Sequence, residues 1–120
     1  MIVVIDDNRD LTHITCQFLN ALGYDTVGAY SGKEGIAKAK ELKPRVILCD
    51  IGMEGMNGHD VARCIRRDEN LKNTCLIAIS GYSTEKDIKL SIDAGFDKHF
   101  SKPVDLKILK DMLDEVCERT

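Results

Sequence analysis

Five side chains that can do chemistry directly follow short apolar runs in this sequence. They are Asp6, Asp7, Asp50, Ser80 and Lys102. The runs before them are continuous and rich in branched residues, which is typical of strands buried on both faces. Because ligands of parallel sheets bind beyond the carboxyl ends of the strands, we expect these side chains to converge at that edge.

The chemistry of such a group is coherent. Three carboxylates held together repel one another, and a divalent cation relieves that repulsion. Mg²⁺ prefers oxygen ligands and commonly pairs one or two carboxylates with a phosphate. A carboxylate beside the ion can attack phosphorus and form an aspartyl phosphate. An ammonium and a hydroxyl then stabilise the phosphoryl oxygens, so the set predicts a phosphoryl-transfer site.

Each residue has a plainer explanation when it is taken alone. Asp6 or Asp7 could cap the helix that follows, and Ser80 could cap another. Asp50 could be a turn residue before a glycine-rich stretch, and Lys102 a solvated side chain. These explanations fit much less well when all five residues share one edge of one sheet, so we favour the common site.

Apolar spacing predicts five strand–helix units that fill residues 1–120 as one domain. We expect strands over residues 1–5, 24–29, 46–49, 75–79 and 96–100. We expect five helices. The first ends at Gly23, the second starts from a Ser31–Glu34 capping box, and the third starts near Gly58. The fourth runs from Ser83 to Gly95, and the fifth spans 104–117. Buried parallel strands with right-handed crossovers predict a doubly wound α/β sandwich.

Two helices carry specific predictions about which face is buried. In the fourth helix we expect Ile88 and Ile92 to point inward. In the last helix one apolar face is expected to hold Leu106, Leu109, Met112, Leu113 and Val116.

Composition excludes several classes of protein. Lys plus Arg number 17 against 20 Asp plus Glu, so the net charge of −3 argues against a nucleic-acid or polybasic membrane surface. The sequence has no apolar run long enough to cross a bilayer, and we expect no signal peptide, because the apolar start at residues 1–5 is short and lacks a basic flank. The five cysteines form no CxxC pair and the three histidines have no metal-ligand spacing. We therefore expect a cytoplasmic protein with reduced thiols.

At this point the motifs resemble a known family. They are Asp6-Asp7 after the first strand, Asp50 ahead of Met53, Gly55 and Gly58, then Ser80, and finally Lys102-Pro103. Together they resemble the receiver domain of two-component response regulators over the whole chain. The stretch 94–104 is similar to receivers attached to hybrid histidine kinases and to single-domain regulators.

The resemblance implies a flavodoxin-like fold with strand order 2-1-3-4-5 and a phosphorelay function. Asp50 would be the phosphoacceptor, supplied by a histidine kinase or a histidine phosphotransfer domain. Asp6, Asp7, Asp50 and the backbone carbonyl of Gly52 would hold Mg²⁺ or Mn²⁺. The domain would catalyse only its own phosphorylation and autodephosphorylation, so we do not expect an enzyme acting on another substrate.

The same resemblance assigns the remaining parts of the switch. Lys102 would contact the phosphoryl oxygens, Ser80 would turn toward them, and the Lys102–Pro103 peptide bond would be cis. The output surface would be the fourth helix and fifth strand, and receivers often form homodimers through these two elements and the fifth helix. The downstream protein target is not specified by the sequence.

Four positions depart from or tune the family pattern. His99 stands where relatives commonly carry Tyr or Phe, which prompts the hypothesis that the output surface is mildly pH-sensitive; the alternative is that His99 merely packs. Gly52 offers no side chain to hold water and Tyr82 could shield the phosphoryl group, which predicts intermediate-to-slow autodephosphorylation. Glu54 replaces a common Pro and is expected to face solvent.

Three other functions remain to be weighed. A phosphohydrolase with an aspartate nucleophile uses similar groups, but it would carry a DxD pattern after the first strand rather than the adjacent Asp6-Asp7. A flavodoxin-like cofactor binder would need a Ser/Thr/Gly-rich phosphate loop at that place. A pseudo-receiver would fold but would not be phosphorylated. Because all the key acidic residues are present, this function would require some other defect in the site.

Overall fold

The computed structural model of the chain describes residues 1–81 and 83–118. Strands and helices alternate throughout. They are β1 (Ile2–Ile5), α1 (Arg9–Ala21), β2 (Thr26–Ala29), α2 (Gly32–Leu42), β3 (Val46–Asp50), α3 (Gly58–Arg67), β4 (Cys75–Ser80), α4 (Glu85–Ala94), β5 (Lys98–Ser101) and α5 (Leu106–Glu118). The predicted series of five strand–helix units is confirmed.

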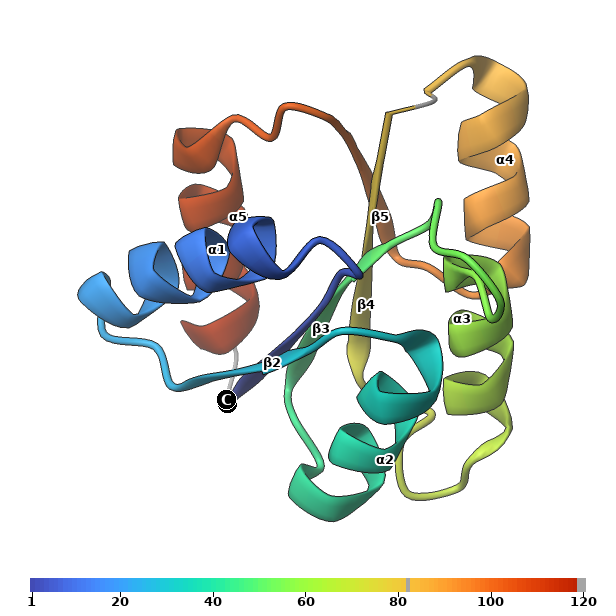
Figure 1. The fold of residues 1–120 in the computed structure, drawn as a ribbon, viewed down its shortest axis with the longest axis horizontal. Helices are drawn as coiled ribbons and strands as arrows, with labels where there is room; N and C mark the ends of the chain where they lie inside the picture. Colours follow the sequence, from blue (N-terminus) through green and yellow to red (C-terminus); the bar gives the residue numbers. More distant parts are fainter. Residues whose placement is uncertain (82, 119–120) are drawn as a thin grey trace.

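The strands form one parallel sheet in the order β2-β1-β3-β4-β5. Helices α1 and α5 lie on one side of the sheet, and α2, α3 and α4 lie on the other (Figure 1). This arrangement confirms the doubly wound, flavodoxin-like sandwich with the expected strand order. It also places the carboxyl ends of all the strands at one edge.

Two apolar cores lie on the two sides of the sheet, and alternate side chains of each strand enter them. In β1, Val3 and Ile5 belong to the core that contains Ile65 of α3. Ile2 and Val4 belong to the core that contains Leu113 of α5. Burial of both faces explains why the three central strands, β1, β3 and β4, are almost entirely apolar.

Local hydrogen bonds set the helix ends that border the strand edge. The Asn8 side chain accepts the Leu11 N–H and begins α1. Capping boxes begin α3, between Asn57 and Asp60, and α4, between Thr84 and Asp87. These caps fix the directions in which the chain leaves β1, β3 and β4.

The capping box expected at the start of α2 is only half present. Ser31 accepts the Glu34 N–H as expected. The Glu34 carboxylate, however, accepts the N–H of Tyr30 rather than that of Ser31. The second hydrogen bond of the capping box is therefore made by the residue before the N-cap, Tyr30, instead of by the N-cap itself.

The predicted inward face of α4 is wrong. Ile88 and Ile92 are 39% and 44% exposed, whereas Ser91 and Ala94 are buried. The helix also begins from Thr84 rather than Ser83. A serine can occupy the inner face because its hydroxyl is fully hydrogen-bonded there, and this pairing leaves the two isoleucines to solvent.

Two boundaries near the C-terminus also differ from expectation. Strand β5 covers Lys98–Ser101 rather than 96–100. Helix α5 begins at Leu106 rather than 104, because the Asp105 carboxylate accepts the N–H groups of the two residues after Leu106. Leu106, expected inside, is 44% exposed, while Leu109 and Leu113 are buried as expected. The side chain of Cys117 lies outside the described residues.

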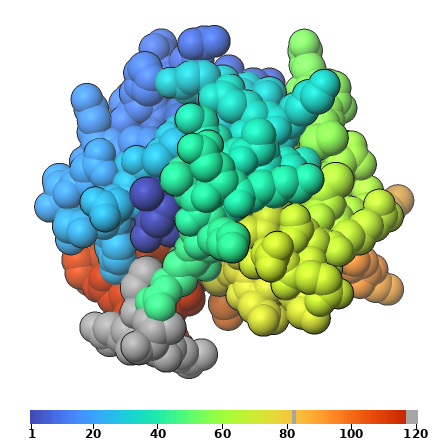
Figure 2. Space-filling view, turned by 90° about the horizontal axis from the view of Figure 1, so that it is seen from below, coloured from blue at the N-terminus to red at the C-terminus, as the bar shows by residue number. Residues whose placement is uncertain are grey.

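Helix α2 lies in the middle of the face seen from below, between α1 and α3 (Figure 2). It approaches β1 closely, because a Cβ on Gly35 would lie 2.3 Å from Cδ1 of Ile5. The helices pack along the sheet, and within residues 1–81 and 83–118 none is both long and apolar enough to span a membrane.

Candidate functional site

The strand ends bring the predicted site residues to one edge. Asp6 follows β1, Asp50 ends β3, Ser80 ends β4, and Lys102 follows β5. Asp6, Asp7 and Asp50, called the acid cluster from here on, offer carboxylate oxygens that all lie within 4.8 Å of one another. Topology alone achieves this convergence, since the residues are far apart in sequence.

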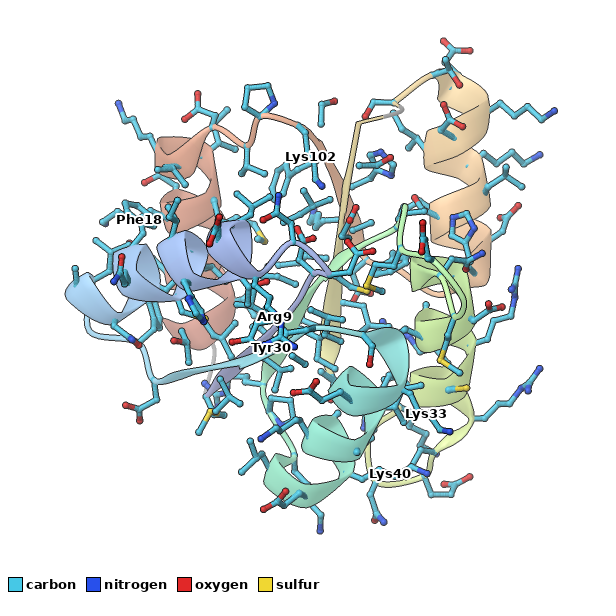
Figure 3. The ribbon with its side chains drawn as sticks, in the orientation of Figure 1. Arg9, Phe18, Tyr30, Lys33, Lys40 and Lys102 are labelled. Carbon is cyan, nitrogen blue, oxygen red and sulfur yellow. The ribbon has the colours of Figure 1, made fainter. Side chains whose placement is uncertain are left out.

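Lys102 pairs with the two buried members of the acid cluster. Its Nζ lies 3.3 Å from Oδ1 of Asp50 and 3.8 Å from Oδ2 of Asp6. Asp6 and Asp50 are only 6% and 7% exposed, whereas Asp7 is exposed. The Lys102 side chain points from the β5–α5 connection toward the strand ends (Figure 3). One ammonium therefore faces three carboxylates, which leaves the edge short of positive charge.

That imbalance is visible in the pKa of Asp6. Burial raises the pKa of Asp6 above its usual value, and the nearby Asp50 carboxylate raises it further. The Asn8 N–H, which donates to Asp6 Oδ1 at 2.9 Å, and the Lys102 ammonium lower the pKa only partly back. The charged form of Asp6 is thus costly unless another cation binds.

The loop after β3 holds the Asp50 carboxylate in one orientation. The Gly52 N–H donates to Asp50 Oδ1 at 3.2 Å, and the same oxygen faces Lys102. Room remains around Gly52, since an added Cβ would meet only Asp50 Oδ1, at 3.9 Å. At Gly58, by contrast, a Cβ would lie 2.7 Å from the Ile51 Cα, so the return of the chain into α3 requires glycine.

One supporting residue was not anticipated from the sequence. Thr12 is fully buried, and its hydroxyl lies 2.9 Å from the carbonyl oxygen of Asp6 and 3.0 Å from that of Asn8. It fastens the first turn of α1 to the chain that carries the acid cluster. Its signal in the sequence is weak, because no motif distinguishes this threonine from any other in a helix.

Ser80 and Lys102 are joined through the backbone. The Lys102 N–H donates to the Ser80 carbonyl at 2.8 Å, which extends the pairing of β4 with β5 by one step. The Ser80 side chain is buried at the edge. The Lys102–Pro103 peptide bond is cis, as expected.

Of the predicted tuning residues, Gly52 and His99 fall within the described residues, and Tyr82 lies outside them. His99 pairs with Ala78 across β4 and β5. Its Nδ1 lies 2.8 Å from the hydroxyl of Ser91 and its Nε2 lies 3.1 Å from that of Ser83. These three residues are called the histidine junction below. Sequence reasoning missed both serines and assigned Ser83 to a helix cap.

An aromatic and basic cluster lies where α1 faces the loop after β2. The Arg9 guanidinium carbon lies 4.3 Å from the centre of the Tyr30 ring, and the two side chains are neighbours in Figure 3. His13 Nε2 lies 2.7 Å from the Tyr30 hydroxyl. No motif indicated this cluster, because its members are separated in sequence and none is unusual alone.

A cavity of about 490 Å³ lies beside the acid cluster. Its walls are mainly apolar side chains of α1 and of the segment after Lys102, among them Leu11, Phe18 and Val104. Ile14 lies on its rim and is 60% exposed. Apolar surface therefore borders the strand-end site on the α1 side.

The acid cluster fits a divalent cation. It supplies only oxygen donors, which is the donor type that Mg²⁺ and Mn²⁺ prefer. Two of its members are buried beside each other, and burial, followed by the Asp50 carboxylate, raises the pKa of Asp6, so a bound cation would relieve the cost of ionising it. With Lys102 and Ser80 alongside, the arrangement can orient a phosphoryl group against a carboxylate.

Comparison with known proteins points to a single family. The sequence profile described as "Response regulator receiver domain" matches residues 2–114. The DNA-binding response regulator MtrA of Mycolicibacterium paratuberculosis is 30% identical over 102 residues, which is 85% of this chain and 44% of MtrA. The chain therefore spans less than half the length of that relative.

Two further matches cover nearly whole proteins. The polar-differentiation response regulator DivK of Brucella ovis is 27% identical over 103 residues, which is 86% of this chain and 84% of DivK. The crystallised chemotaxis protein CheY4 of Vibrio cholerae superimposes with a TM-score of 0.90 at 23% identity, covering 96% of each chain. The second match shows a shared fold.

Proposed function

The chain belongs to the response regulator receiver domain family, and we propose that it is a phosphorylation switch whose phosphoacceptor is Asp50. The observation that carries the proposal is the geometry of Asp50. It is buried at a strand end, its Oδ1 is held by the Gly52 N–H and faced by Lys102, and two further carboxylates lie beside it. A fixed carboxylate next to a cation is suited to attack phosphorus.

The donor is a phosphohistidine of a histidine kinase or of a phosphotransfer domain. A carboxylate oxygen of Asp50 attacks the phosphorus atom, and a phosphorus–oxygen bond forms. The phosphorus–nitrogen bond breaks, and its electron pair returns to the donor imidazole. Lys102 neutralises one phosphoryl oxygen as it moves from the two carboxylates toward the incoming group.

Asp6, Asp7 and Asp50, with the backbone carbonyl of Gly52, would hold Mg²⁺ or Mn²⁺. The bound ion would neutralise carboxylate and phosphoryl charge. Asp6 and its neighbour Asn8 are already fixed for this task, since the Asn8 N–H orients the Asp6 carboxylate. Asp7 is exposed at the rim and would supply its carboxylate to the ion from the solvent side.

Ile14 and the cavity beside it provide the surface on which the donor docks. An isoleucine 60% exposed beside a buried charged site is poorly suited to solvent and well suited to contact with a partner. The chain's role is that of a signalling switch that acts only on its own phosphorylation and dephosphorylation. Ser80 then communicates the phosphoryl group to α4 and β5, the output surface.

The deciding experiment compares the wild-type protein with Asp50→Asn. Each is incubated with Mg²⁺ and acetyl phosphate, and intact mass is recorded. We expect an increase of one phosphoryl group in the wild type, its loss in EDTA, and none in Asp50→Asn. An Asp50-independent increase, or rapid turnover of an unrelated phosphate ester, would refute the proposal.

A further inference from the structure

The cavity beside the acid cluster has two chemically different ends. Its walls come from α1, from the strands beneath it and from the chain after Lys102, and they are mainly apolar. Three charged side chains also line it, Asp6, Asp50 and Lys102, and all three lie at the strand-end edge. Its volume of about 490 Å³ is in the range of sites that hold small organic molecules. The cavity therefore has the form of a site for a molecule with one charged and one apolar end.

The apolar part of the cavity follows α1 away from the charged end. Leu11, Ile14 and Phe18 line it at intervals of three and four residues, so they share one face of the helix. Leu11 and Phe18 are seven residues apart, which is about 10 Å along a helix. Val104 adds apolar wall from the connection between β5 and α5. A hydrocarbon chain can lie along this wall while its head group stays at the acid cluster.

The charged end of the cavity favours a cation. Asp6 and Asp50 supply two negative charges and Lys102 supplies one positive charge. Asp7 adds a third carboxylate to the same cluster. The summed field of these groups is negative, so it attracts a cationic head group and repels an anionic one.

Lys102 shows that an alkylammonium group fits at this end, and it leaves an acceptor for a second one. Its Nζ lies within hydrogen-bond distance of Asp50 Oδ1, at 3.3 Å, but 3.8 Å from Asp6 Oδ2, which is too long for a hydrogen bond. The other oxygen of Asp6, Oδ1, accepts the Asn8 N–H. A primary ammonium has three N–H donors, so it can bond Asp6 Oδ2 and reach a neighbouring carboxylate as well.

We propose that the cavity binds an amphipathic primary amine, whose protonated amino group contacts Asp6 and Asp50 and whose hydrocarbon chain lies along α1. An alkylamine resembles the lysine side chain, whose ordinary pKa is about 10.4, so it is charged at pH 7. The head group makes charge-assisted hydrogen bonds, and the chain buries apolar surface. Each buried methylene group strengthens binding by about three- to fourfold.

The amine and a divalent cation use the same carboxylate oxygens. A bound ammonium occupies two members of the acid cluster and places a like charge beside the ion, so each ligand weakens the binding of the other by the same factor. The amine also covers apolar surface beside Ile14, where the phosphohistidine donor docks. Inhibition of phosphorylation by the amine rests on the proposed function, whereas binding of the amine does not.

Amide NMR titrations of the full chain, in EDTA and a buffer free of primary amines, test the site with four probes. They are hexylamine, ethylamine, hexanol and hexanoate. We expect hexylamine to bind at least about tenfold more tightly than ethylamine, which has four fewer methylene groups. It should exceed hexanol and hexanoate by a similar factor, because they lack the positive charge. Replacing EDTA by saturating Mg²⁺ should weaken hexylamine at least about fivefold.

Two variants separate the cavity from the rest of the surface. Val104→Phe fills the cavity from a half-buried position and should weaken hexylamine at least about tenfold, while Mg²⁺ binding stays unchanged. Ile92→Phe adds the same ring at an exposed position of α4, outside the cavity walls, and should match the wild type.

Equal affinities for hexylamine and ethylamine would show that the apolar wall is not used, and equal affinities for hexylamine and hexanol that the carboxylates are not. Either result overturns the proposal, as does unchanged hexylamine binding in Val104→Phe. Hexanoate that binds more tightly than hexylamine in Mg²⁺ also overturns it, because the site would then take an anion through the metal ion. Phosphorylation by acetyl phosphate is measured separately without amine, and its failure refutes the proposed function while the amine site stands.

Discussion

The acid cluster and the histidine junction are both polar groups inside an apolar sandwich, yet they are held in opposite ways. The acid cluster gathers three like charges against one ammonium, and its members repel one another. The junction gathers one imidazole and two hydroxyls, and both ring nitrogens have a partner. The first group is incomplete and suited to receive a cation and a phosphoryl group, whereas the second is complete and suited to hold a conformation.

Lys102→Ala should give the largest effect, because it removes the only cation that contacts the two buried members of the acid cluster within the described residues. Loss of one preorganised charge contact commonly costs about 100-fold in rate. We expect that decrease in phosphorylation by acetyl phosphate, measured by intact mass over time. Lys98→Ala, at an exposed position of β5, the strand that Lys102 follows, is the control and should leave the rate unchanged.

If Lys102→Ala retains the wild-type rate, the acid cluster does not need its cation, and the contrast with the junction disappears. Lys102→Arg should recover only part of the rate, since its planar charge is spread differently from a compact ammonium. Folding of each variant is checked first by far-ultraviolet circular dichroism.

Ile14→Asp should reduce phosphotransfer from a phosphohistidine donor about tenfold. The substitution puts a charge on the exposed apolar surface beside the cavity and leaves the acid cluster untouched. Phosphorylation by acetyl phosphate, which needs no docking surface, should stay at the wild-type rate. Equal losses with the two donors would show that Ile14 supports the site itself rather than a partner.

How far the sequence could predict these two groups depends on what holds them together. Asp6, Asp50 and Lys102 follow strands, so the topology of a parallel sheet brings them together whatever their local contacts. The sheet order, supplied by the family resemblance, and the edge were therefore foreseen. Ser83 and Ser91 meet His99 through side-chain hydrogen bonds between separate elements. No periodicity encodes such bonds, so the inner face of α4 was assigned to the isoleucines.

Asp6→Asn should stabilise the metal-free protein at pH 7. The pKa of Asp6 is raised above its ordinary 3.8, so the fold favours the protonated form. The stability that Asp6 contributes is fully present below that ordinary value and is lost as pH rises through the raised one. Asparagine keeps the acceptor for the Asn8 N–H without the charge.

Urea unfolding in EDTA at pH 7 and pH 3.5 measures this effect. The advantage of Asp6→Asn should shrink at the lower pH, and added Mg²⁺ should stabilise the wild type more than the variant. Asp111→Asn, an exposed carboxylate on α5, is the matched control. A variant less stable than the wild type at pH 7 would mean that the acid cluster is satisfied without a metal ion.

The smallest effect is expected on the outer face of α4. Ile88→Ser and Ile92→Ser should change the free energy of unfolding by no more than about 0.5 kcal/mol each, because both side chains are already 39% and 44% exposed. Ser91→Ala, which removes only the hydroxyl that contacts His99, should destabilise the protein more than either. Urea unfolding at pH 7 measures all three. If the two isoleucine substitutions destabilise the protein more than the Ser91 substitution does, Ile88 and Ile92 form the inward face that their spacing predicted. The hydrogen bonds of the histidine junction would then contribute little to stability.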